Sequence, residues 1–127
     1  MSDTRKKGLE YFQKKFGHKP SEFVSVSRLF PPEKSWTGRK TWWFDLPVKR
    51  IRANEKKYYY LLGAKTEKKA SFVIVKIPNK FLIKNRKRFE TRYNGMIRLH
   101  LSAYKKNWLV DERGKGRVSF SRFQKDC

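Results

Sequence analysis

The chain has 127 residues, of which 33 are Lys or Arg and 11 are Asp or Glu, so that its formal charge is +22. Its 10 Phe, 6 Tyr and 4 Trp residues exclude a disordered basic tail, because such tails are poor in aromatic side chains. This length predicts a single domain over residues 1–127. A compact domain with this charge excess repels itself, which points to an anionic partner: nucleic acid, an acidic protein or a membrane surface.

Cysteine content and the length of apolar runs limit the cellular compartments that suit the protein. Cys127 is the one cysteine, so the chain has no internal disulfide and no paired-cysteine zinc site. No apolar run reaches the roughly 20 residues that cross a bilayer, and no apolar stretch of a signal peptide follows Met1. We expect an intracellular protein, cytoplasmic or in the nucleoid or nucleus, with no metal, no cofactor and no membrane contact.

The N-terminal third begins with a predicted helix. Leu9, Phe12 and Phe16 recur at helical spacing and predict an amphipathic helix over residues 4–16. The next stretch, residues 23–30, fits either a strand with alternating valines or a short helix. Two prolines then predict a loop that runs to Lys40.

The middle of the chain has the strongest strand signals. Alternation over residues 41–49 predicts a strand with Trp42, Phe44 and Leu46 directed inward. Residues 58–64 read as a second strand that is apolar on both faces. Residues 71–77 read as a third and, being β-branched, a central strand. Short connections favour an antiparallel meander.

A second helix and two further β segments follow. Asn79 is the expected cap of a helix over Lys80–Tyr93, which Asn94 and Gly95 end. Residues 96–103 alternate as a strand, with His100 among the outward positions. Residues 107–110 and 117–123 are expected to form the arms of a last hairpin. The predicted fold is α+β: a single curved, mostly antiparallel sheet or partial barrel of five to seven strands with two packed helices.

Three basic segments are candidate binding sites for nucleic acid. The first is the polar face of the helix over residues 80–93, where phosphates would relieve repulsion between like charges and release counterions. A solvated face is the alternative for this segment. Its candidate residues are Lys80, Lys84, Lys87, Arg88 and Arg92.

The second segment interleaves aromatic and basic residues: Trp36, Arg39, Lys40 and Trp43. An exposed indole stacks on a base while neighbouring cations hold the backbone. The alternative is that the tryptophans belong to the core.

The third segment is a glycine-rich turn with Arg113, which would form a flexible cationic finger or simply a hairpin tip. Its other cations are Lys115 and Arg117.

The sequence offers few residue patterns that are typical of a catalytic site. A nuclease core that uses Mg²⁺ places carboxylates on adjacent strands. Asp45 suits the first carboxylate, but the third strand reads Ile74-Val75-Lys76, with an apolar residue where a second carboxylate belongs. No nucleophile and base share a supporting spacing, so no catalytic residue is assigned.

The sequence therefore predicts a nucleic-acid-binding protein, with DNA favoured over RNA. A small Mg²⁺-dependent nuclease, or a degenerate one that binds without cutting, is the first alternative. A basic module that docks on an acidic protein is the second. A membrane-binding module is the least favoured hypothesis, because the apolar side of the helix over residues 80–93 is expected to pack against the sheet. The oligomeric state is left open.

Overall fold

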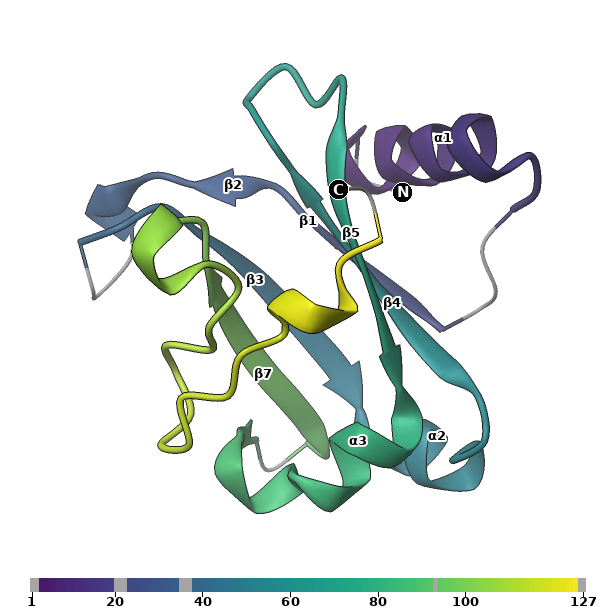
Figure 1. Ribbon diagram of the computed structural model, residues 1–127, viewed down its shortest axis with the longest axis vertical. Coiled ribbons are helices and arrows are strands. Elements are labelled where there is room, and N and C mark those ends of the chain that lie inside the picture. Colours follow the sequence, from purple (N-terminus) through teal and green to yellow (C-terminus); the bar gives the residue numbers. More distant parts are fainter. Residues whose placement is uncertain (1–2, 20–22, 35–37, 93, 126–127) are drawn as a thin grey trace.

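The computed structural model describes residues 3–19, 23–34, 38–92 and 94–125, and its secondary-structure elements form an α+β fold (Figure 1). The helices are α1 (Asp3–Phe16), α2 (Val48–Ala53) and α3 (Asn79–Lys84). The strands are β1 (Val24–Ser27), β2 (Leu29–Phe30), β3 (Thr41–Pro47), β4 (Tyr58–Ala64), β5 (Phe72–Pro78), β6 (Glu90–Thr91) and β7 (Met96–Ser102). Short 3₁₀ turns are η1 (Pro32–Lys34), η2 (Arg86–Arg88), η3 (Lys105–Asn107) and η4 (Ser121–Phe123).

The strands form two sheets, so the expectation of a single sheet is wrong. One sheet has the order β1-β4-β5 and the other the order β2-β3-β7-β6. The first is mixed, because β1 runs parallel to β4, and the second is antiparallel throughout. No closed barrel forms among the described residues. The meander is also wrong, since β3 pairs with β7 rather than with β4.

The β4 strand is the centre of the three-stranded sheet, and its two apolar faces serve two cores. Leu61 belongs to the large cluster between the sheets, whereas Leu62 belongs to a smaller cluster beneath α1. Strand β5 lies at the sheet edge rather than at its centre. The C-terminal segment covers that edge, with Gln124 bridged to Val75 and the Lys125 N–H donating to the Ile74 carbonyl at 2.9 Å.

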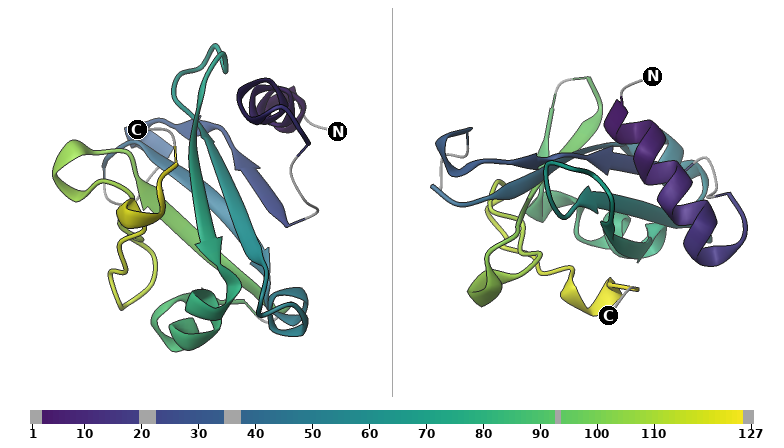
Figure 2. Two further views of the ribbon diagram at one scale, coloured as in Figure 1. Left: turned by 45° about the vertical axis from the view of Figure 1, so that its right-hand side comes forward. Right: turned by 90° about the horizontal axis from the view of Figure 1, so that it is seen from above.

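Helix α1 confirms the prediction for residues 4–16 and lies on the outer face of the three-stranded sheet. Phe12 is buried there, and a Cβ added at Gly8 would lie 2.7 Å from Cγ1 of Val26. Glycine is therefore required where the helix crosses the sheet most closely. Figure 2 shows α1 and the C-terminal segment on opposite sides of the molecule.

The main core lies between the two sheets. Trp42, Phe44 and Leu46 point into it as predicted, each at most 3% exposed. The Trp42 ring lies so close to Gly63 that a Cβ there would be 2.8 Å from the indole. Its Nε1–H donates to the Ala64 carbonyl at 2.8 Å, which satisfies the buried donor.

The predicted helix over residues 80–93 is wrong in its length. Helix α3 ends at Lys84, and η2 and then β6 follow it. Asn85 directly follows the last residue of α3. Its backbone N–H donates to the Phe81 carbonyl at 3.1 Å, and its side-chain amide donates to the same carbonyl at 2.9 Å. Asn79 is not the cap but the first residue of α3, where it is buried and donates from Nδ2 to the Asn54 carbonyl.

Two further expectations also need correction. Residues 48–53 form helix α2 instead of a strand end, with Val48 and Ile51 buried. The last hairpin is reduced to an isolated bridge between Val110 and Ser119, followed by η4. Within the described part of the chain, every helix is too short or too polar to cross a membrane.

Candidate nucleic-acid interface

A basic groove of about 730 Å³ opens beside α2, α3 and η2. Five cationic side chains line it: Arg52, Lys84, Arg86, Lys87 and Arg88. Ile83 and Phe89 supply its apolar surface. Among the described residues that line it, none is acidic. A concave surface with charge of one sign focuses the electrostatic field and concentrates anions.

Local backbone conformation explains how the cations gather there. The early end of α3 is followed by the tight η2 turn, and a 3₁₀ helix has about three residues per turn. All three consecutive basic residues of this turn line the groove. In α2, Val48 and Ile51 are buried while Arg52, one turn after Val48, is exposed.

Arg88 joins the groove to the glycine-rich turn. Its Nη2 donates to the Gly116 carbonyl at 2.8 Å, and the Gly116 N–H donates to the Arg88 carbonyl at 3.1 Å. A Cβ at Gly114 or Gly116 would lie 2.4 Å from Arg88 atoms. The predicted flexible finger is thus a loop packed on η2, and two of the three predicted basic segments lie side by side.

The base of this loop is fixed by a buried carboxylate. Asp111 is fully buried and accepts hydrogen bonds from the backbone N–H groups of His100, Arg113 and Gly114, each at 3.1 Å. Burial raises the pKa of Asp111, although the three N–H donors act in the opposite direction. The loop conformation therefore depends on one side chain that three backbone groups share.

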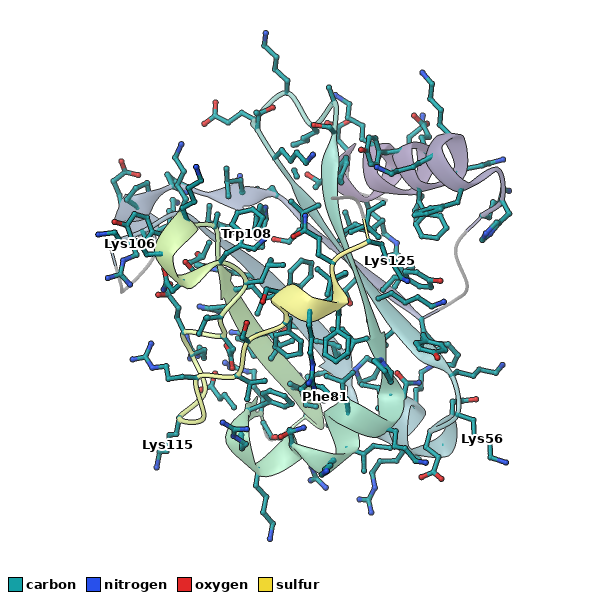
Figure 3. The ribbon with its side chains drawn as sticks, in the orientation of Figure 1. Lys56, Phe81, Lys106, Trp108, Lys115 and Lys125 are labelled. Carbon is teal, nitrogen blue, oxygen red and sulfur yellow. The ribbon has the colours of Figure 1, made fainter. Side chains whose placement is uncertain are left out.

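The cations of the loop differ in their surroundings. Arg113 forms a bidentate ion pair with Glu90, and its hydrogen bonds hold the pKa of Glu90 below the usual range. Lys115 and Arg117 are exposed. Figure 3 shows the labelled Lys115 side chain extending from the loop into solvent. Lys115 and Arg117 are therefore the cations that the loop presents outward.

The aromatic-basic segment is arranged differently from the prediction. Trp36 lies outside the described residues. The Trp43 ring is stacked between Phe30, at a centroid distance of 3.9 Å, and His100, at 4.7 Å. Both faces of the indole are thus covered. Arg39 pairs with the buried Glu112 at 3.0 Å, whereas Lys40 is exposed.

His100 is buried rather than directed into solvent, with 6% of its surface exposed. Burial, together with the nearby charges of Arg113 and Arg98, lowers its pKa to about 4. The imidazole is therefore neutral at physiological pH. It packs as a flat ring against Trp43.

The groove contains three of the candidate residues from the helix that was predicted over residues 80–93. It also contains two cations that were not among the candidates. Lys84, Lys87 and Arg88 line it, while Lys80 and Arg92 lie on flanking positions of the chain. Arg86 belongs to the same basic run and is placed by the η2 turn. Arg52 comes from α2, which the spacing of its two buried residues, three apart, could have indicated.

Carboxylates are not gathered in the way a metal centre requires within the described residues. Asp45 lies on β3, where the sequence placed it, and its carboxylate accepts from Arg98 at 3.0 Å. The groove, by contrast, gathers five cations on one concave surface with no carboxylate among its described lining residues. Comparisons with protein-family models, with curated proteins and with solved structures gave no significant match.

Proposed function

We propose that the protein binds nucleic acid, with DNA as the preferred polymer, in the basic groove beside α2, α3 and η2. The observation that supports this is the convergence of five cations on one concave surface without a lining carboxylate among the described residues. Each phosphate that such cations neutralise releases condensed counterions, which drives binding to a polyanion. The formal charge of +22 adds long-range attraction.

The side-chain chemistry of the groove suits phosphates. Two of its cations, Arg52 and Arg86, carry planar guanidinium groups of the kind that bonds two phosphate oxygens at once, while the guanidinium of Arg88 is bonded to Gly116 and adds its charge. The apolar surface of Ile83 and Phe89 lowers the local dielectric and strengthens these interactions. These contacts position a backbone and read no bases, so the groove itself is expected to be indifferent to sequence.

The glycine-rich loop extends the same surface. Because Gly116 is bonded to Arg88, the exposed Lys115 and Arg117 are held next to the groove rather than free in solvent. A strand of nucleic acid in the groove would meet these cations as it leaves. The groove and the loop together provide contacts to several successive phosphates.

Fluorescence anisotropy tests the proposal directly. Labelled single-stranded and duplex DNA, and matched RNA, are titrated with the protein over a series of salt concentrations. The expected result is tight binding at low salt, a log–log salt slope equivalent to several phosphates, and tighter binding of DNA than of RNA. If no polymer binds at low salt, the proposal fails and an acidic protein becomes the partner to seek.

A parallel series with Mg²⁺ addresses the nuclease alternative. Intact polymer on a denaturing gel after prolonged incubation is the result expected of a binding protein. Shortened products that require Mg²⁺ would instead support a nuclease, and Asp45 would be the first residue to replace. This arm uses the same protein and the same labelled strands, so binding and cleavage are compared directly.

A further inference from the structure

A second pocket, of about 380 Å³, lies away from the basic groove and has a different chemistry. Its walls are apolar and aromatic: Leu29, Trp42, Val73, Ala103 and Trp108. Its polar lining consists of Lys40, Lys65 and Gln124. We propose that this pocket takes an unpaired nucleobase of the strand whose phosphates occupy the groove, an inference that rests on the proposed function.

The aromatic walls are arranged to offer carbon surface. Trp108 meets Trp42 edge to face, with ring centroids 5.4 Å apart and planes at 86°. The indole N–H of Trp42 donates to the Ala64 carbonyl, and that of Trp108 donates to Oε1 of Gln124, both at 2.8 Å. Trp42 is only 2% exposed and supports the half-buried Trp108, and because the Trp108 N–H donor is already bonded within the protein, that ring meets a guest through its π surface. Such stacking accepts any base.

The Trp108 ring is held in place while part of it stays accessible. It is half-buried, and its bond to Gln124 ties it to the C-terminal segment that covers β5. Figure 3 shows the labelled Trp108 beside the β3 and β7 strands, with Lys106 extending outward nearby. A ring fixed in this way loses little conformational entropy when a base stacks on it.

The cations identify the occupant as a nucleotide rather than a neutral apolar ligand. Lys40 directly precedes β3 and Lys65 directly follows β4, so the two lysines reach the pocket from strand ends of the two different sheets. Both are exposed, and no acidic residue lines the pocket within the described structure. A base in the aromatic cavity carries a phosphate on each side, which matches two lysines at its rim.

The size of the pocket suits an unpaired base. A volume of about 380 Å³ lies within the range of pockets that hold small ligands. A base inside a duplex is paired and stacked, so its ring enters a pocket only after it has left the helix. The protein is therefore expected to prefer single strands, or duplexes with unpaired positions, over perfect duplexes of the same charge.

Abasic strands separate base binding from phosphate binding. A single-stranded DNA oligonucleotide is compared with a strand of the same length that consists of abasic sugar–phosphate units. We expect the wild-type protein to bind the base-containing strand roughly tenfold more tightly. Trp108→Leu, which keeps an apolar side chain, is expected to bring this ratio close to one while affinity for the abasic strand stays unchanged.

Three further variants complete the test. Trp108→Phe keeps an aromatic ring and is expected to retain most of the ratio. Lys40→Gln with Lys65→Gln, at exposed positions that do not threaten folding, is expected to weaken binding of both strands. The control, Lys6→Gln with Lys14→Gln, removes two exposed lysines from α1 and should leave the ratio at its wild-type value.

The outcomes distinguish this inference from the proposed function. Equal wild-type affinity for the two strands would overturn the base pocket and leave phosphate binding in the groove intact. An unchanged ratio in a folded Trp108→Leu protein would also overturn it. Absence of binding to either strand would contradict the proposed function, and with it the pocket. If Trp108→Leu does not fold, the inference is still overturned by equal wild-type affinity for the two strands, or by a Lys40→Gln with Lys65→Gln protein that binds both strands as tightly as wild type.

Discussion

Arg88 and Gly116 hold each other through two hydrogen bonds, one from the guanidinium to the glycine carbonyl at 2.8 Å and one from the glycine N–H to the arginine carbonyl at 3.1 Å. This pair joins η2 to a loop 28 residues later in the chain. Of the cations in the groove, Arg88 therefore has a structural role beyond its charge. Variants that probe binding should leave Arg88 in place.

Gly116→Ala should destabilise the protein by about 1–3 kcal/mol, because the new methyl group overlaps the Arg88 side chain. The measurement is the midpoint of urea unfolding. Lys115→Ala, at the exposed position next to it, is the matched control and should change stability by less than about 0.5 kcal/mol. Equal midpoints for wild type and Gly116→Ala would show that the loop does not pack on η2.

Asp111→Asn should cost about 1–3 kcal/mol of stability, since the amide group accepts fewer hydrogen bonds than the carboxylate. The Gly114 N–H donates to Oδ2 of Asp111, and an amide nitrogen in that position leaves this buried donor unpaired. Urea unfolding measures the change. Glu67→Gln, in an exposed turn, should leave the midpoint unchanged. A variant as stable as wild type would contradict the role of Asp111 in fixing the loop.

Stability should fall as the pH decreases from 6.5 to about 4, because the unfolded state then binds a proton that the buried His100 of the folded state does not. The pKa of His100, about 4 instead of 6.5, sets the total loss near 3 kcal/mol, with full stability above pH 6.5. The difference between wild type and His100→Phe, measured by urea unfolding across this range, isolates the contribution. A pH profile of His100→Phe that runs parallel to that of wild type would contradict the prediction.

Trp43→Phe should leave affinity for nucleic acid within about twofold of wild type. Both faces of the Trp43 ring are covered, by Phe30 and by His100, so a base has no face on which to stack. Anisotropy with single-stranded DNA is the measurement, with circular dichroism to confirm folding. A large loss of affinity in a folded variant would restore the sequence-based expectation that Trp43 contacts bases.

Local patterns predicted much of the fold. The apolar alternation of β3 was sufficient to predict a strand, and the spacing of Phe12 and its apolar neighbours was sufficient to predict the helix α1. Both predictions succeed because one face of each element is buried. The pairing of β1 parallel to β4 and the division into two sheets depend on long-range contacts that no local pattern records. The end of α3 depends on Asn85, a residue whose amide competes for backbone carbonyls.

Part of the candidate site was accessible to sequence reasoning and part was not. Lys84, Lys87 and Arg88 stood out as a run of charge, and they line the groove. Arg52 was missed because the helix that directs it is only six residues long. Trp108 was not predicted as a candidate, because its ring is positioned by contacts with Trp42 and Gln124, which are distant in the sequence.

The most direct test of the central claim is the affinity for single-stranded DNA of Lys84→Glu with Lys87→Glu, measured by anisotropy at several salt concentrations. The control is Lys6→Glu with Lys14→Glu, which makes the same change in net charge on α1, at the end of the molecule opposite α3 (Figure 1). We predict that the groove variant stays folded, loses at least about tenfold in affinity and has a shallower salt slope, while the α1 variant loses much less. Equal losses in the two folded variants would show that the protein attracts nucleic acid by net charge alone and would contradict binding in the groove.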